Sequence, residues 1–181
     1  IRDQSRELKL MIEKKPDAAR TFDRFQQIYN GIPVIGGEII VQVDSNNNIL
    51  SANGETLPKI AVSTTPTIDA STASQNALNA VATKYSLQVG DLTTTTPELW
   101  IYNPSLIGPG TGITQLVWRM EVLPKALEPI REFVLVDALR GGVALQFGQI
   151  ENVLNRQTYT ANNGTTVPGT LICTESNPTC S

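Results

Sequence analysis

The sequence predicts an α+β fold made of two small modules whose sheets are mainly antiparallel. Apolar and polar residues alternate with a period of two in several segments of residues 1–60 and of residues 98–147. A single clear segment, at about 71–85, has the spacing of a helix. Short turn-rich connections separate the strand candidates, which favours antiparallel pairing. The 181 residues give room for one ordinary domain or two small ones.

The first module is expected to cover residues 1–60 and to consist of strands. A helix over 6–15 is compatible with the composition, but the alternation at 8–12 and the presence of Pro16 favour a strand, followed by a turn at 15–17. Further strands are predicted at residues 22–29, 38–43 and 49–52, of which the second is rich in β-branched residues.

The second module is expected at residues 71–148, after a linker at 61–70 in a stretch rich in Pro, Thr and Ser. Asp69 or Ser71 can cap the helix, whose alanine-rich face is thin enough to lie close on a sheet. We therefore expect this helix to pack on the second sheet. The strands of that sheet are predicted at residues 98–103, 116–122, 132–136 and 143–147.

Residues 149–181 have no sustained hydrophobic period and are expected to form a turn-rich tail with one short strand near 154–159. Both cysteines of the chain, Cys173 and Cys180, lie in this tail. A disulfide between them in an oxidising compartment is the favoured interpretation, and two free thiols are the alternative.

The composition argues against several classes of function. The 14 basic and 17 acidic residues give a net charge of −3 with no basic cluster, so a nucleic-acid partner is not expected. Histidine is absent, which excludes His-dependent triads and imidazole zinc sites. No apolar run reaches the roughly 18 residues that span a membrane. Trp100 and Trp118 suit stacking on a sugar, but their strand patterns favour packing. The chain is thus expected to be no enzyme and to hold no cofactor.

Two runs of residues are more distinctive. In the run 24–38, Gly31 allows a tight reversal and Pro33 fixes the chain after it, while Gly36 and Gly37 allow a bulge or a close backbone approach. In the run 133–142, Asp137 can accept amide hydrogens of a tight turn that includes Gly141. Taken alone, both runs are explained as structural hairpins. The first run reads Arg24-Phe25-Gln26-Gln27-Ile28-Tyr29-Asn30-Gly31-Ile32-Pro33-Val34-Ile35-Gly36-Gly37-Glu38.

These runs also resemble known family signatures. Residues 24–38 resemble the propeptide module shared by fungalysins and thermolysin-like proteases, and residues 97–147 resemble the cystatin-like PepSY module that follows it. Residues 153–175 are similar to the start of the mature thermolysin-like catalytic domain. The helix that usually opens the first module is expected upstream of Ile1, and the zinc-binding catalytic domain is absent from this chain.

The resemblance implies the pro-region of a secreted zinc metalloprotease, with residues 149–181 as junction and N-terminal stub of the mature enzyme. Such a pro-region is an intramolecular chaperone and inhibitor until it is cleaved, so the implied partner is the cognate catalytic domain in cis. Zinc and calcium are expected only in that domain. The resemblance marks Arg24, Gln27 and Tyr29 as contacts to the partner, and the alternative for Arg24 is an internal carboxylate.

Processing is expected between Phe147 and Arg156, because the last strand ends there and a linker can extend into a protease cleft. Thermolysin-like enzymes, by the resemblance, favour a bulky apolar residue just after the cut bond. The candidate bonds precede Ile150, Val153 and Leu154, with Gln149–Ile150 first; the alternatives are cleavage elsewhere by another protease and a strand at 154–159 that protects the chain.

Two other functions remain open at the level of the sequence. One is a free-standing PepSY-type envelope protein that binds or inhibits proteases in trans. The other, from a different class, is an extracellular module that binds carbohydrate or cell wall.

Overall fold

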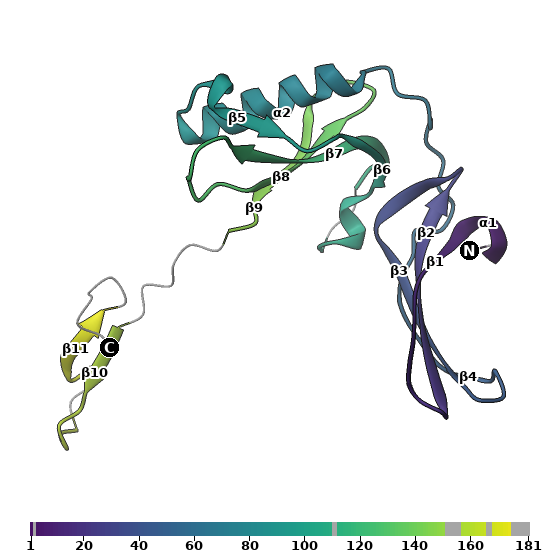
Figure 1. Ribbon diagram of the computed structural model, residues 1–181, viewed down its shortest axis with the longest axis horizontal. Coiled ribbons are helices and arrows are strands. Elements are labelled where there is room, and N and C mark those ends of the chain that lie inside the picture. The colour runs from purple at the N-terminus through teal and green to yellow at the C-terminus, as the bar shows by residue number, and fades with distance from the viewer. Residues whose placement is uncertain (2, 110–111, 151–156, 166–167, 175–181) are drawn as a thin grey trace.

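The computed structural model describes residues 1, 3–109, 112–150, 157–165 and 168–174 of the chain. Figure 1 shows two β-sheets that meet at an angle, one long helix on the second sheet, and a small hairpin near the C-terminus. The sheets are almost entirely antiparallel. The predicted α+β class and the antiparallel pairing are therefore confirmed.

The first sheet contains four long strands in the order of the chain. A single helical turn, α1 (Gln4–Glu7), comes before them. The strands are β1 (Leu8–Asp17), β2 (Arg20–Tyr29), β3 (Ile32–Asp44) and β4 (Ile49–Glu55), each antiparallel to the next. This sheet presents much of its surface to solvent, and β1 is exposed along nearly its whole length.

The turn predicted at residues 15–17 is wrong, because β1 continues through Pro16 to Asp17. Pro16 lacks an N–H donor, which an edge strand tolerates, and β1 is the edge of the sheet. The reversal comes two residues later, where the Asp17 carboxylate accepts a hydrogen bond from the backbone N–H of Ala19 at 2.9 Å.

The tight reversal predicted at Gly31 is confirmed. Asn30 and Gly31 join β2 to β3, and both have positive φ, at 48° and 82°. Two successive residues with positive φ define the type of turn whose twist matches a right-handed β-hairpin. Asn and Gly are the residues that adopt it at least cost.

The second sheet follows a helix, as predicted. The helix α2 (Ala70–Tyr85) leads through the short 3-10 turn η1 (Val89–Asp91) into the sheet. Its strands are β5 (Leu92–Thr94), β6 (Glu98–Tyr102), β7 (Gln115–Pro124), β8 (Glu132–Asp137) and β9 (Val143–Gly148), with a second 3-10 turn, η2 (Pro104–Leu106), after β6. The strands β6, β7, β8 and β9 are adjacent in that order, and β5 pairs with the far end of β7.

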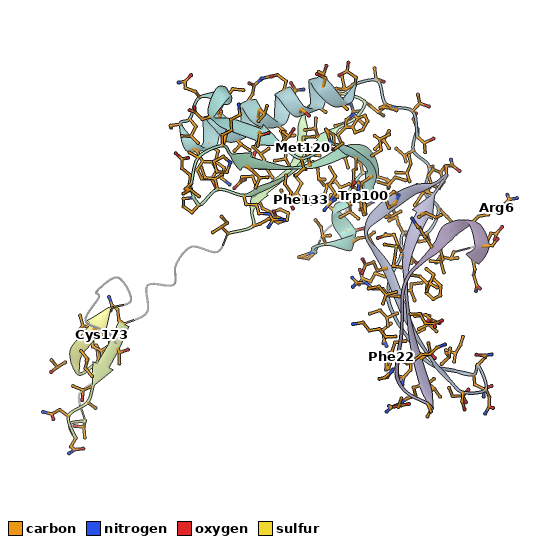
Figure 2. All side chains as sticks on the ribbon, in the orientation of Figure 1. Arg6, Phe22, Trp100, Met120, Phe133 and Cys173 are labelled. Atoms are coloured by element: carbon orange, nitrogen blue, oxygen red, sulfur yellow. The ribbon has the colours of Figure 1, made fainter. Side chains whose placement is uncertain are left out.

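Helix α2 covers one face of the second sheet and closes the main core. Asp69 caps it, because its carboxylate accepts a hydrogen bond from the N–H of Thr72 at 2.7 Å. The small side chains of Ala73 and Ala77 are fully buried and let the helix lie close on the strands. Figure 2 shows Met120 between helix and sheet, whereas Trp100 and Phe133 lie on the other side of the sheet.

One strand joins the two sheets. The start of β3 pairs in parallel with β6 through a single bridge, Val34 to Ile101, and both side chains are fully buried. Further along, β3 pairs with β4 from Glu38 to Val43. The covalent connection, residues 56–69, contains neither helix nor strand.

The tail folds separately as the hairpin of β10 (Gln157–Thr160) and β11 (Thr170–Thr174). One strand was expected near 154–159, and residues 154–156 of that range lie outside the described residues. Cys173 is on β11 and is not a free thiol. Cys180 lies outside the described residues, so the pairing of these two cysteines stays a prediction.

Candidate partner-binding surfaces

Arg24 forms an ion pair within the first sheet. Its Nε donates to the Glu38 carboxylate at 2.9 Å, and its Nη2 also contacts that carboxylate. The pair joins β2 to β3, and both side chains remain well exposed. The internal carboxylate considered for Arg24 therefore exists and is Glu38, while a contact to a partner stays a prediction. An exposed pair of this kind contributes only about 0–1 kcal/mol to stability.

Gln27 is buried and anchors the connection that leaves the first sheet. Its side-chain amide accepts from the Leu57 N–H at 2.8 Å and donates to the Leu57 carbonyl at 2.9 Å. The neighbouring Gln26, which the sequence did not single out, is also buried and donates to the carbonyls of Val34 and Gly37. Both glutamines therefore satisfy backbone groups inside this module. A contact of Gln27 with a partner stays a prediction.

Tyr29 ends β2 beside an open cleft of about 470 Å³. The cleft is lined by α1, the end of β2 and the connection, including Ile28, Leu57 and Lys59. Tyr29 is half-buried in this setting. Gln27 lines the same cleft, so the structure brings Gln27 and Tyr29 together, whereas Arg24 lies in its exposed ion pair outside the cleft.

The glycines of the first run make the predicted close approach. Gly36 has a φ of +73°, and a Cβ there would lie 3.1 Å from the Leu106 carbonyl oxygen of η2. A Cβ on Gly37 would lie 2.9 Å from the side-chain oxygen of Gln27. Pro33 stands opposite Ile28 in the β2–β3 pairing. The two glycines therefore let β3 approach the second sheet on one side and Gln27 on the other.

The second run forms the predicted turn between β8 and β9. One carboxylate oxygen of Asp137 accepts from the backbone N–H groups of Leu139 at 2.7 Å and Arg140 at 3.0 Å. Gly141 has a φ of +79°, and its carbonyl accepts a hydrogen bond from the Asn76 side chain of α2. The turn is thus held on the helix as well as on itself.

A buried carboxylate, which sequence reasoning missed, lies where the chain leaves the second sheet. The side chain of Glu132 is fully buried and accepts hydrogen bonds from Lys84, Tyr85 and Gln146. Burial raises its pKa, but the three hydrogen bonds together outweigh burial and hold the pKa below the ordinary 4.5. The hydrogen bonds to Glu132 raise the pKa values of Lys84 and Tyr85. Gly148 is adjacent, since a Cβ there would lie 3.1 Å from the carboxylate.

The face of the second sheet away from α2 carries an array that we call the aromatic ladder, made of Trp100, Arg119, Phe133 and Phe147. The Arg119 guanidinium lies 5.2 Å from the ring centre of Trp100 and 5.4 Å from that of Phe133. Phe133 stacks on Phe147 with ring centres 5.0 Å apart. The ladder therefore crosses β6, β7, β8 and β9. The alternation of Trp100 and Phe147 with their neighbours signals this face, but their mutual register is not readable from one strand.

The expected processing region begins at the end of β9. The Gln149 N–H still donates to the Arg131 carbonyl at 2.8 Å, and Ile150 is exposed. Val153 and Leu154 lie outside the described residues. Within the described part of the chain, no cluster of three or more His, Cys, Asp or Glu side chains is arranged to hold a metal ion. No helix there is long and apolar enough to cross a membrane.

Comparison with known proteins adds a family to this geometry. Residues 7–56, which include all four strands of the first sheet, match the family model "Fungalysin/Thermolysin Propeptide Motif". The chain is 23% identical to a bacillolysin of Brevibacillus brevis over 85% of its own length and 35% of that protein. It is 29% identical to a bacillolysin of Bacillus subtilis strain 168 over 92% of its length and 32% of that protein.

Two further similarities are more limited. A "Transglutaminase-activating metalloprotease" of Streptomyces mobaraensis is 38% identical over 35% of this chain and 8% of that protein. The solved "Bacillus megaterium YpeB C-terminal domain" aligns with 81% of this chain and 57% of that one, at 12% identity and a TM-score of 0.39. The chain thus spans about a third of the bacillolysins that it matches. Residues 7–56 thus carry the fungalysin/thermolysin propeptide motif, and most of the chain is similar to part of the bacillolysins.

Proposed function

We propose that this pro-region is an intramolecular chaperone and inhibitor of a secreted thermolysin-like metalloprotease, active until it is cleaved away. The observation that carries the proposal is the propeptide motif, together with similarity to bacillolysins that covers most of this chain but only a third of theirs. On this proposal the partner is the catalytic domain in cis, and zinc and calcium belong to that domain.

The exposed apolar side chains of the first sheet support this role. Val34 is the only apolar side chain of the first sheet that is buried among the described residues. Large apolar side chains of the same sheet are exposed, among them Leu10, Met11 and Ile40. Large apolar side chains that are exposed together on one sheet are typical of an interaction site. A catalytic domain that folds against such a surface would bury it.

Tethering explains how a surface of modest affinity can inhibit. Two parts of one chain meet at an effective concentration of about millimolar when a short flexible linker joins them. A pro-region therefore inhibits efficiently while it is attached and more weakly once the linker is cut. We accordingly propose the boundaries 1–60 and 71–148 for two modules, 61–70 for their linker, and 149–181 for the junction with the start of the mature enzyme.

We propose processing between Phe147 and Arg156, first at the Gln149–Ile150 bond. The exposed side chain of Ile150 suits an enzyme that prefers a bulky apolar residue after the cut bond. The hydrogen bond from the Gln149 N–H to Arg131 must open for this bond to enter a cleft. Incubating the chain with mature bacillolysin and sequencing the new amino termini tests this. New termini only within 55–70 or only beyond Tyr159 would contradict it.

The inhibitor role is tested by titrating mature Bacillus subtilis bacillolysin with the folded chain and measuring peptide hydrolysis. We expect saturable inhibition, and faster recovery of activity when the denatured enzyme is refolded with the chain present. An unrelated protein of matched size and charge serves as the control. Hydrolysis and refolding that are the same with the chain and with the control would refute both roles.

A further inference from the structure

The aromatic ladder has the composition and the rigidity of a protein-binding surface. Trp and Arg are the residues that dominate binding energy at interfaces, where they are held in fixed geometry. Here Arg119 lies between two aromatic rings and also donates to Glu98 at 3.3 Å. The Arg119 side chain is 35% exposed, so further guanidinium N–H groups can donate to acceptors on a partner. Phe147, at the end of the ladder, is 45% exposed.

Part of the same sheet face is already covered by the first module. Ile35 of β3 packs against a cluster formed by Tyr102, Val117 and Leu135. These residues share the ladder's face, because Val117 pairs directly with Trp100 across β6 and β7. The first module therefore protects the end of the face near β6. The end near β8 and β9, with Phe133 and Phe147, is left open.

Figure 1 shows the first sheet extending from this corner on the side of the second sheet that is opposite α2. The open part of the ladder and the first sheet thus lie on the same side of the second sheet. The chain also leaves the second sheet beside the ladder, since β9 ends one residue after Phe147. Polypeptide that continues from β9 is therefore tethered next to the open end of the ladder.

The charges around the ladder favour a protein occupant over an anionic polymer. Glu98 is paired with Arg119, and Glu121 is paired with Arg131. The two acidic and two basic side chains neutralise one another, so no basic strip is left for a polyanion. An apolar protein surface with a few acceptors over Arg119 is complementary to this arrangement.

We propose that the open end of the aromatic ladder, centred on Phe133 and Phe147, is the docking surface for the catalytic domain of a thermolysin-like metalloprotease. This assignment rests on the proposed function and places the main contact on the second module. The residues that the sequence run marked, Arg24, Gln27 and Tyr29, are then secondary to it. Docking here holds the partner beside the junction that begins at Gln149.

The test compares Phe147→Glu with Leu139→Glu in the inhibition of mature Bacillus subtilis bacillolysin. Both residues are exposed to a similar degree, at 45% and 36%, but Leu139 lies in the turn between β8 and β9, at the other end of β9 from Phe147. We expect Phe147→Glu to weaken inhibition about thirtyfold, as a central contact of an interface does. Leu139→Glu should change it less than about threefold, as a residue outside the centre of an interface does.

Phe147→Ser is the milder second variant if the glutamate prevents folding, and the tryptophan emission of each protein reports whether the second sheet is intact. Equal inhibition by folded wild type and Phe147 variants would overturn this proposal and leave the proposed function standing. A wild type that does not inhibit would overturn both. Loss of a concentration-dependent dimer in the Phe147 variants, or Trp100-dependent binding to insoluble cell-wall polysaccharide, would assign the ladder to another occupant and overturn it too.

Discussion

Replacing Glu132 with glutamine tests how much the buried carboxylate contributes to the second module. The side chain is fully buried and accepts from Lys84 Nζ at 2.8 and 2.9 Å, from Tyr85 Oη at 2.7 Å and from Gln146 Nε2 at 3.1 Å. An amide keeps one acceptor oxygen but turns an NH₂ group toward one of these donors. The substitution therefore removes a charge and creates a buried clash of donors.

The magnitude follows from what each partner can do afterwards. Breaking a buried ion pair costs about 3–5 kcal/mol when the other partner stays buried. The Lys84 side chain is 44% exposed and regains water, which reduces the penalty. We expect Glu132→Gln to lower the free energy of unfolding by about 2–3 kcal/mol. With a urea dependence of about 1–2 kcal/mol per molar, the midpoint falls by about 1–3 M.

Urea unfolding followed by tryptophan emission isolates this effect. The only two tryptophans of the chain, Trp100 and Trp118, both lie in the second sheet, so the signal reports that module. Glu98→Gln is the matched control, because Glu98 is 60% exposed in its pair with Arg119. It should cost less than about 1 kcal/mol. A Glu132→Gln midpoint within error of the Glu98→Gln midpoint would refute the reasoning.

The same carboxylate predicts a pH dependence. The pKa of Glu132 is lower in the folded chain than its ordinary 4.5, so its contribution is present above pH 4.5 and is lost as the pH falls through the folded value. Lys84 and Tyr85 have raised pKa values, so their contributions are lost as the pH rises above about 10. Glu132→Gln should flatten the acid side of the stability profile. An acid limb identical to that of the wild type would contradict the assignment.

Three further predictions concern turns, close contacts and the tail. Gly37→Ala should lower the free energy of unfolding of the first module by about 1–3 kcal/mol, and its thermal midpoint with it, because the added Cβ would press on Gln27. Gly142→Ala, in the turn between β8 and β9, should be near neutral in the same melting experiment, because no atom lies within 4 Å of the added Cβ. Asp137→Ala should cost about 1–2 kcal/mol in urea unfolding, and Asp137→Asn should recover most of it because an amide oxygen still accepts the turn N–H groups. Peptide mapping without reductant should recover Cys173 linked to Cys180, and two alkylatable thiols in fresh secreted protein would contradict the bridge.

Local sequence rules predicted the elements whose causes are local. Asn30-Gly31 is sufficient for its turn, Asp69 for the start of α2, and Asp137 for the turn after β8, because each acts on its nearest neighbours. The strand β5 was missed, because three residues are too few to show alternation and its support comes from β7.

The parts of the surface that sequence reasoning missed depend on distant partners. Gln26 and Gln27 read as polar strand residues, yet they are buried because their amides satisfy backbone groups of β3 and of the connection. Glu132 stands in an apolar strand, and its partners lie on α2 and β9. The aromatic ladder requires the register of four strands at once. Periodicity gives the face of each residue but not its neighbours across the sheet.

The shared strand β3 has a consequence for a nicked molecule. The strand β3 pairs with β4 in the first sheet and with β6 in the second sheet. The connection at residues 56–69 begins only after these strands of the first sheet. A cut within that connection therefore leaves Val34 seated against Ile101, and Gly36 against η2. The two fragments have a non-covalent joint with buried side chains on both sides. Proteolysis between the sheets is thus a different event from their separation, and we expect a nicked chain to migrate as one particle until it is denatured.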